Sequence, residues 1–273
     1  MLTNILITTS VIIAFILIAR KSRCASSKHG DSINIVKSNT QEVSQESKTF
    51  TVATFNIQGG KNLSGNRDIR RASQAIKNAD LVGIQEVYAP TYANRLSFGH
   101  SQTETLAQPG SFNWLFCATK RRWFRDFQGN ALLSKLTTKD WSTTMLPHKV
   151  GKNFRNMTVV KVSLQGEDFH FINTHLHTKE GKEEQFNAVV SEFKKYPRAI
   201  LVGDFNSMPN EAHMLKLLQD DSIVDAINVC GIDPDENNRI DWILCKGFHV
   251  HQGLILEKGI SDHPYYQVTM SIY

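Results

Sequence analysis

Six short polar motifs, each at the end of an apolar run, constrain this sequence more than any other feature. They read Phe55–Gly59 (FNIQG), Gln85–Val87 (QEV), Asn173–Leu176 (NTHL), Gly203–Asn206 (GDFN), Arg239–Trp242 (RIDW) and Ser261–Pro264 (SDHP). Carboxylates, amides and imidazoles at the ends of buried strands can gather in one cleft, where they hold a metal ion and transfer protons. The pattern therefore indicates a folded domain that carries an enzyme site.

Strand-like and helix-like segments alternate from residue 50 onward. We predict strands at residues 50–57, 81–84, 114–118, 131–134, 157–164, 169–173, 199–202, 240–245, 250–256 and 266–272. Helical spacing occurs at residues 69–76, 183–193 and 211–218. The mixture, in a chain with 41% hydrophobic residues, predicts one α/β sandwich domain over residues 50–273.

The N-terminal segment has a different composition. Residues 5–19 are almost wholly apolar and are followed by Arg20, Lys21 and Arg23. This pattern predicts a membrane anchor within residues 1–21, and the positive-inside rule favours a cytoplasmic domain. A secreted protein with a cleaved signal is the alternative, although the charges follow the apolar run instead of preceding it. Residues 22–49 show no apolar period and are predicted to be a polar, solvated linker.

The net charge of the chain gives little information about a binding partner until it is counted separately for the N-terminal segment and the domain. The net charge is +5, but residues 1–49 hold six Lys/Arg and three Asp/Glu, so the rest is only +2. The local segment Lys120–Arg125 combines four cations with two aromatic residues. A phosphate-facing loop and a charged strand edge both explain this segment.

Acidic side chains follow two of the predicted strands. Asp204 and Asn206 come after a run that is apolar enough to be buried on both faces, and they can present a base and an amide to one phosphate. An Asx-turn or a helix cap is the structural alternative for Asp204. Glu86 ends a similar run, and one such carboxylate is a plausible anchor for Mg²⁺.

Two histidines lie among these carboxylates. Asp241 would be costly to bury alone, and pairing with His263 resolves that cost and raises the basicity of the imidazole. Asp262 places a possible metal or water ligand beside His263. His175 ends the strand predicted at residues 169–173 and is a candidate because of the motifs around it.

Taken in order, the motifs resemble the endonuclease/exonuclease/phosphatase superfamily, which has the fold of deoxyribonuclease I. The resemblance covers residues 50–272 and implies a four-layered α/β sandwich, with two mixed β-sheets packed face to face and helices outside. It also implies cleavage of phosphate esters with Mg²⁺, for which Mn²⁺ is a possible substitute. By the same resemblance, the metal would be held by Glu86, Asp262 and Asn56.

The resemblance also assigns roles to the other motif residues. The phosphate would be contacted by Asn56, Asn206 and Arg155. Asp241 would orient His263, which contacts the phosphate and transfers a proton, while Asp204 positions or activates the attacking water. The identity of the general acid, His175 or His263, and the number of metals stay open. The sequence shows no carboxylate partner for His175.

These features lead to three functional hypotheses. A deoxyribonuclease I-like nuclease acting on DNA or RNA is favoured by the 120–125 segment and Arg155. A membrane-associated phospholipid or sphingomyelin phosphodiesterase, or a phosphoinositide phosphatase, is favoured by the N-terminal segment. A non-catalytic binding module is less favoured because all six motifs are present. His175 also argues against the branch specialised for abasic-site repair, which lacks a histidine at this position.

Overall fold

The computed structural model describes residues 2–20, 23–30, 49–90, 101–121, 127–148, 154–234 and 237–273. Two seven-stranded β-sheets form its centre. In pairing order, the first sheet contains β1 (Arg23–Cys24), β5 (Asn113–Arg121), β6 (Phe127–Ser134), β4 (Leu81–Ala89), β3 (Thr49–Asn56), β14 (Tyr265–Ile272) and β13 (Phe248–Leu256). The second sheet contains β11 (Val224–Asp225), β12 (Asp241–Lys246), β10 (Ala199–Asp204), β9 (Glu167–His175), β8 (Asn156–Leu164), β7 (Thr137–Met145) and β2 (Lys28–Gly30).

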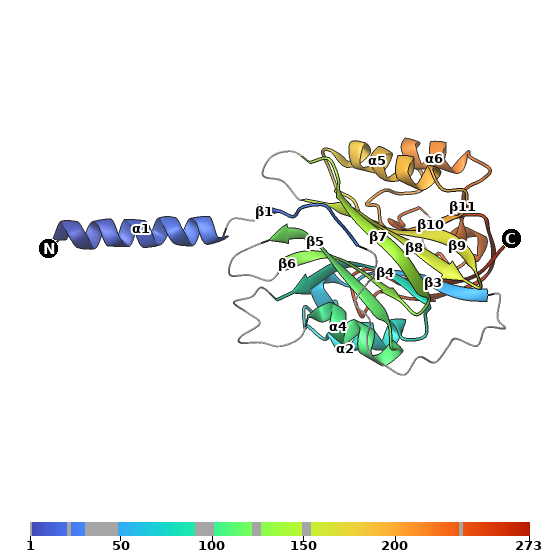
Figure 1. Cartoon of the computed structure of the whole chain (residues 1–273), viewed down its shortest axis with the longest axis horizontal. Helices are drawn as coiled ribbons and strands as arrows, with labels where there is room; N and C mark the ends of the chain where they lie inside the picture. Colours follow the sequence, from blue (N-terminus) through green and yellow to red (C-terminus); the bar gives the residue numbers. More distant parts are fainter. Residues whose placement is uncertain are drawn as a thin grey trace.

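Both sheets are mixed, and most of the helices cover their outer faces. The helices are α1 (Leu2–Arg20), α2 (Ile69–Ile76), α4 (Gln102–Ala107), α5 (Lys182–Lys194), α6 (Ala212–Leu218) and α7 (Ala226–Val229), with short 3₁₀ turns η1 (Gln58–Gly60) and η2 (Gln108–Gly110). Figure 1 shows α5 and α6 on one outer face and α2 and α4 on the other. The β3–β4 and β9–β10 pairs are parallel, whereas the other strand pairs are antiparallel. The predicted four-layered sandwich of two mixed sheets is confirmed.

The local sequence explains most of these elements. Helix α2 begins at the expected residue because the Asp68 carboxylate accepts the Arg70 amide at 3.1 Å as an N-cap. Helix α4 was not predicted, although a capping box formed by Ser101 and Glu104 starts it. Strand β7 was also missed, because its Thr-rich sequence is mostly solvent-exposed and lacks an apolar run.

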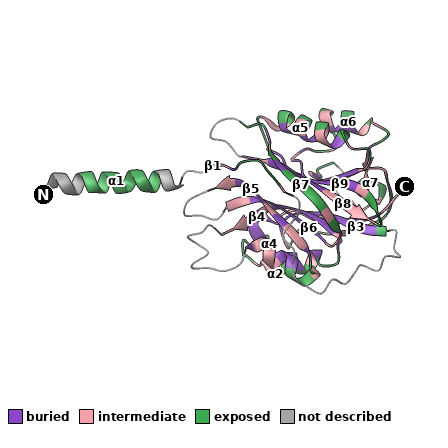
Figure 2. Cartoon of the chain, viewed as in Figure 1, coloured by how far each residue is buried: buried purple, intermediate pink, exposed green. Residues whose placement is uncertain are grey.

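The largest cluster of buried apolar residues lies between the two sheets (Figure 2). Phe50, Phe169 and Phe248 meet there, with ring centroids 5.3–5.8 Å apart. Separate apolar clusters lie beneath α5 and α6 and beneath α2 and α4. This packing holds the strands of both sheets in fixed register, so residues at their ends have defined positions.

The polar motifs come together because their strands end at the same edge of the sandwich. Asn56 is in register with Gln85, and Asp204 is in register with both His175 and Asp241. We call this side of the molecule the motif edge. The opposite edge contains the turn between β8 and β9 and the turn between β6 and β7.

The segment between α1 and the domain differs from the prediction. Residues 23–30 do not behave as a solvated linker: β1 pairs with β5, and β2 pairs with β7. Their backbone groups find partners on open sheet edges, a contact that side-chain composition does not reveal. The rest of the predicted linker, residues 31–48, lies outside the described residues. Among the residues that the structure describes, no helix has the length and apolar character needed to cross a membrane.

Candidate active site

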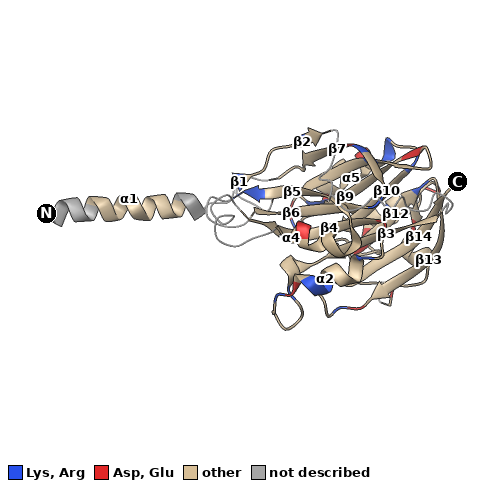
Figure 3. Cartoon of the chain, turned by 60° about the horizontal axis from the view of Figure 1, so that its bottom comes forward, with Lys and Arg blue, Asp and Glu red and all other residues tan. Residues whose placement is uncertain are grey.

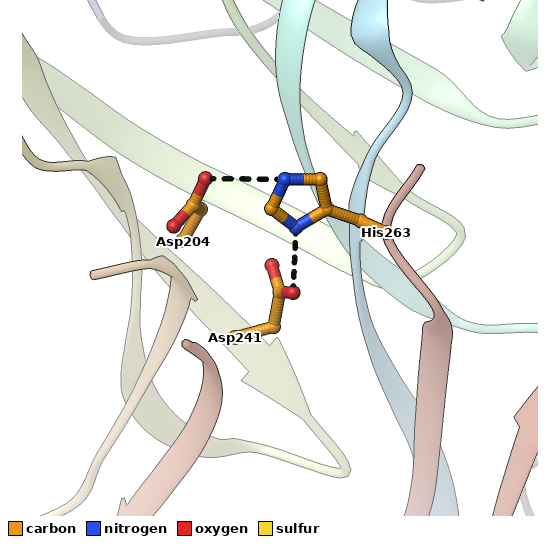
Figure 4. A group of neighbouring side chains, drawn as sticks. All are labelled: Asp204, Asp241 and His263. Atoms are coloured by element: carbon orange, nitrogen blue, oxygen red, sulfur yellow. Dashed lines mark hydrogen bonds and ion pairs between the residues drawn. The ribbon is translucent and has the colours of Figure 1, made fainter. Parts of the chain in front are cut away.

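Asp204 is the centre of the residues gathered at the motif edge. Its Oδ2 atom accepts hydrogen bonds from Asn56 Nδ2 at 3.0 Å and contacts His175 Nε2 at 3.2 Å. The same oxygen lies 3.8 Å from His263 Nε2 (Figure 4). The other carboxylate oxygen, Oδ1, accepts the Asn206 amide at 2.9 Å. Asp204 therefore makes the Asx-turn considered as an alternative and also faces both histidines.

Gly203 allows Asp204 to reach this position. Its φ angle is +145°, and a Cβ atom at this residue would lie 2.0 Å from the carbonyl oxygen of Thr174 in β9. Strands β9 and β10 can pair at this point only if residue 203 has no side chain. The glycine of the GDFN motif is thus explained by close backbone approach.

His263 and Asp241 form the predicted pair. Asp241 Oδ2 lies 2.8 Å from His263 Nδ1, and Figure 4 shows the imidazole between Asp241 and Asp204. Burial alone would lower the pKa of His263, but the charge and hydrogen bond of Asp241, with the charges of Asp204 and Asp262, raise it to about 9. His263 is therefore an imidazolium at neutral pH.

The neighbouring carboxylate of Asp204 is shifted toward its neutral form. Burial and then the charge of Asp241 raise its pKa well above the usual carboxylate range, although His263 and the hydrogen bonds from Asn56 and Asn206 oppose the shift. A carboxylate with a raised pKa is a better proton acceptor than an ordinary aspartate. This environment suits a group that takes a proton from water.

His175 has a different environment from His263. Arg155 Nη1 lies 3.1 Å from His175 Nδ1, and a guanidinium has only donors. Nδ1 therefore accepts, and the ring proton lies on Nε2, which donates to Asp204. Burial and then the charge of Arg155 hold the pKa of His175 well below its usual range. His175 is a neutral donor in this arrangement: Nε2–H faces the Asp204 carboxylate, a partner that the sequence did not reveal, and Nδ1 faces Arg155.

Two of the three predicted metal ligands, Asp262 and Asn56, are hydrogen-bonded to Gln58. Gln58 Nε2 donates to Asp262 Oδ2 at 2.7 Å, and its backbone amide donates to Asn56 Oδ1 at 3.1 Å. Glu86 directly follows Gln85, the register partner of Asn56, and its charge acts on Arg155. Glu86, Asp262 and Asn56 thus lie on neighbouring segments of the motif edge.

This donor set fits a hard divalent cation. Two carboxylates and one amide oxygen match the preference of Mg²⁺ for a few oxygen ligands with retained waters. A different, second cluster, Asp204, Asp241 and His263, is the one whose ligand atoms lie within 4.8 Å of one another among the His, Cys, Asp and Glu side chains that the structure describes. In that cluster His263 is already bound to Asp241 through Nδ1, and imidazole is a poor ligand for Mg²⁺. The chemistry of the second cluster therefore suits proton transfer better than binding of Mg²⁺.

Backbone strain is concentrated at this edge. Gln58, Glu86 and Asn206 have φ angles of +47°, +60° and +49°, in the left-handed region. Glu86 also lies at an irregularity in the β4–β6 pairing between Ile84 and Val87, which turns its side chain out of the regular alternation. Non-glycine residues adopt such angles at a cost, and this cost is common at functional sites.

Two further residues support the site and were not assigned a role from the sequence. Arg239 Nη1 donates to the Asp241 carbonyl at 3.2 Å, and its side chain bonds Asp225 and Asp233 while it stacks 3.9 Å from Trp242. Lys182 Nζ donates to the Asn206 carbonyl at 2.8 Å. The position of Arg239 inside the RIDW motif could have indicated its role. Lys182 lies in α5, outside the motifs, and nothing in the sequence indicated its role.

Asn206 was predicted to contact phosphate, and the 120–125 segment was predicted to be either a phosphate-facing loop or a charged strand edge. Asn206 Nδ2 donates to the Leu176 carbonyl at 3.0 Å, so part of its amide is used within the protein. Only Lys120 and Arg121 of the cationic segment belong to the described residues. The charge of Lys120 reaches the site, since it contributes to the lowered pKa of His175. Phosphate contact by Asn206 or Arg155 stays a prediction.

Comparison with known proteins identifies the family. The sequence matches the Endonuclease/Exonuclease/phosphatase family over residues 53–263, more than three quarters of the chain. The chain therefore belongs to this family, whose members are phosphoesterases. A comparison with the curated proteins finds no match.

Solved structures share the fold at low sequence identity. An endonuclease/exonuclease/phosphatase from Beutenbergia cavernae aligns with a TM-score of 0.68 and 20% identity, covering 82% of this chain and 72% of the other. A mannosyl-6-phosphatase from Bacteroides thetaiotaomicron gives 0.62 and 17%, with 82% and 100% covered. TDP2 from D. rerio, in complex with a single-strand DNA product, gives 0.60 and 14% with the same coverage. At these identities the likeness shows the fold and leaves the substrate undetermined.

Proposed function

We propose that this protein is a Mg²⁺-dependent phosphodiesterase that hydrolyses nucleic acid. The observation that carries the proposal is the surrounding of one buried carboxylate: Asp204 contacts Asn56, His175 and His263, and His263 is paired with Asp241. A base, two kinds of neutral donor and a cationic imidazole thus converge at one point. Hydrolysis of a phosphodiester needs these groups.

Each residue has a distinct part in the proposed reaction. Asp204 accepts a proton from water, and the water oxygen bonds to phosphorus as the P–O bond to the leaving group breaks. The imidazolium of His263 gives its proton to the leaving oxygen, and Asp241 keeps the ring oriented. The second hydrogen of Asn56 Nδ2 donates toward a phosphoryl oxygen, where negative charge develops, while His175 Nε2–H donates to Asp204 and orients its carboxylate. His175 is not assigned the acid role because its pKa is lowered.

The metal would be held by Glu86, Asp262 and Asn56. A divalent cation at these oxygens supplies positive charge that stabilises the transition state. Gln58 fixes the Asp262 carboxylate and the Asn56 amide oxygen, and so prepares the ligands.

Nicking of supercoiled plasmid by the full-length protein tests the proposal. We expect nicking with Mg²⁺, loss of nicking with chelator, and loss with His263→Ala. His251→Ala is the matched control, since His251 is exposed and bonds Ser271 away from the motif edge. Activity of folded His263→Ala equal to the wild type would contradict the mechanism.

A phospholipid is the second candidate substrate. The described α1 side chains, residues 7–17, are all exposed, and most are apolar. Such a helix would bring the domain to lipid phosphoesters. If folded protein fails to nick DNA, release of phosphorylated headgroup or of inorganic phosphate from phospholipid vesicles, with the same His263→Ala control, becomes the decisive assay.

A further inference from the structure

Helix α1 is joined to the body of the protein at the motif edge. It ends at Arg20, and β1 begins at Arg23, so three peptide units separate them and span at most about 11 Å. Strand β1 pairs antiparallel with β5, with Arg23 opposite Arg121 and Cys24 opposite Lys120. The chain therefore enters the sandwich at the end of β5, and Figure 1 shows α1 projecting from that side.

The segment 23–30 fixes this entry to both sheets. After β1, the Ala25 amide donates to the Thr119 carbonyl at 3.0 Å, and Ala25 is buried. The Ser27 hydroxyl then accepts the Met145 amide at 3.1 Å, and β2 pairs with β7. At Gly30 an added Cβ would lie 2.7 Å from the indole nitrogen of Trp141. We call residues 23–30 the strap.

The strap lies at the same end of the strands as the candidate active site. In the first sheet, Lys120 is in register with Gln128 and through it with Tyr88, two residues beyond Glu86. In the second sheet, Met145 is opposite Asn156, whose neighbour Met157 is opposite Thr174, next to His175. With strands about 4.8 Å apart, the lateral separation from β2 to β9 is about 14 Å.

Helix α1 needs an apolar environment that the rest of the described chain does not supply. Ile7, Val11, Ile12, Ile13, Phe15, Ile16 and Leu17 are 43–64% exposed. A helix that is apolar on all sides is normally buried. Its C-terminal flank is cationic in sequence, with Arg20, Lys21 and Arg23, and the strap adds Lys28. Figure 3 shows cationic positions where β1 lies beside the end of β5. Apolar residues followed by cations match the acyl and anionic headgroup layers of a bilayer.

We propose that the motif edge is the face that this protein turns toward an anionic lipid bilayer, with α1 inserted in the lipid and the strap as a rigid link. The docking surface comprises α1, the strap and the adjacent ends of β5 and β7. It sets the direction from which substrate reaches Asp204. It brings the second candidate substrate, a phosphoester carried by the membrane, to the site, and for that consequence alone it rests on the proposed phosphodiesterase activity.

Amide hydrogen exchange of the full-length protein tests the docking surface without using catalysis. Exchange is compared with vesicles of phosphatidylcholine and 30% phosphatidylserine, with phosphatidylcholine alone, and without lipid. We expect slower exchange with the anionic vesicles in α1, in the strap and at residues 206–211 of the motif edge. The turn at residues 164–167, on the opposite edge, should be unchanged. Protection on the opposite edge, or protection of α1 alone, would overturn the proposal.

A matched pair of variants tests the part played by charge. Lys28→Gln should weaken binding to the anionic vesicles about fivefold, the effect of about 1 kcal/mol for one cation near the surface. Lys77→Gln, an exposed lysine at the end of α2 on the opposite edge, should bind as the wild type. Equal binding of both variants would contradict the proposal. A dimer explanation would also contradict the proposal. It would be indicated by a stable dimer in sedimentation without lipid, together with no added protection of α1 when vesicles are present, because a second copy would then cover α1.

Catalytic and docking failures are distinguishable in these experiments. Protein that is protected by vesicles but hydrolyses neither plasmid nor phospholipid would retain the docking surface and refute the proposed function. Protein that nicks plasmid but shows no protection at the motif edge would retain the proposed function and refute the docking surface.

Discussion

Arg155 donates to Nδ1 of His175 across 3.1 Å, and this contact sets the chemistry of the histidine. Because the guanidinium is only a donor, the imidazole must accept at Nδ1 and carry its proton on Nε2, toward Asp204. The two histidines at the motif edge are consequently different: His175 is neutral, whereas His263, paired with Asp241, is charged.

Arg155→Met tests this contact. We expect kcat to fall about 10- to 100-fold, the value of one hydrogen bond from a charged donor, because His175 loses its fixed tautomer. KM should change little, since Arg155 acts through His175. The matched control is Arg198→Met, an arginine paired with Glu167 on the opposite edge. A large rise in KM with unchanged kcat would instead identify Arg155 as a substrate phosphate ligand.

His263→Ala should lower hydrolysis about 10²- to 10⁴-fold, the range of a lost acid–base group. The expected loss arises because the site no longer has a cation to protonate the leaving group. Initial rates of the wild type and the variant give the ratio, and circular dichroism checks that the variant is folded. A loss below threefold would assign proton donation to another group.

The pH profile should report the Asp241–His263 pair. Activity requires ionised Asp204, whose pKa is raised by burial and by Asp241, so it should rise with pH above the usual carboxylate range. It requires protonated His263, so it should fall as pH passes about 9. Asp241→Asn removes the charge that raises the pKa of His263, and the alkaline limb should move to lower pH. An unmoved limb would exclude His263 as its source.

The same pair has a stability consequence with a defined sign. The pKa of His263 is raised from 6.5 to about 9, so the folded state binds this proton more tightly than the unfolded chain. The stabilisation from His263 is therefore complete below pH 6.5 and is lost as pH rises through about 9. Urea unfolding of the wild type and Asp241→Asn from pH 6 to about 9.5 should show this difference, with the variant less dependent on pH.

Gln58→Ala should raise the Mg²⁺ concentration needed for half-maximal activity about 10- to 100-fold. The reason is that Gln58 holds the Asp262 carboxylate at 2.7 Å. Gln74→Ala, on the exposed face of α2, is the control. Mg²⁺ titrations of activity and calorimetric titrations of the metal measure the effect. An unchanged metal affinity would remove Asp262 from the proposed ligand set.

Gly203→Ala should destabilise the fold by about 2–5 kcal/mol, because its Cβ would overlap the Thr174 carbonyl. Gly259→Ala has a comparable φ of +156° but open space around it, and should cost only about 1–2 kcal/mol. Urea unfolding of the two variants separates the steric clash from the backbone angle. Equal losses would show that the clash is relieved by movement of β9.

The sequence by itself determined the sheet strands with apolar runs, helix α2 to the residue, the family, and the order of the motif residues along the chain. These depend on local periodicity and on side-chain chemistry, which can be read from neighbouring residues. It also predicted the Asp241–His263 pair, because an isolated buried carboxylate requires a partner. Strand β7, whose stability comes from its pairing with β8 and not from an apolar pattern, was beyond such reasoning.

Only the tertiary structure decided which groups control the motif residues. Arg155 beside His175, Gln58 on Asp262 and Lys182 on Asn206 each join segments that are 20 to 204 positions apart in the chain. The strap was read as solvated linker because its pairing uses backbone groups, which are the same in every sequence. The charge states of the two histidines were also decided by the tertiary structure. Burial and charged neighbours make His175 neutral and His263 cationic, and packing across the two sheets sets both the burial and the neighbours.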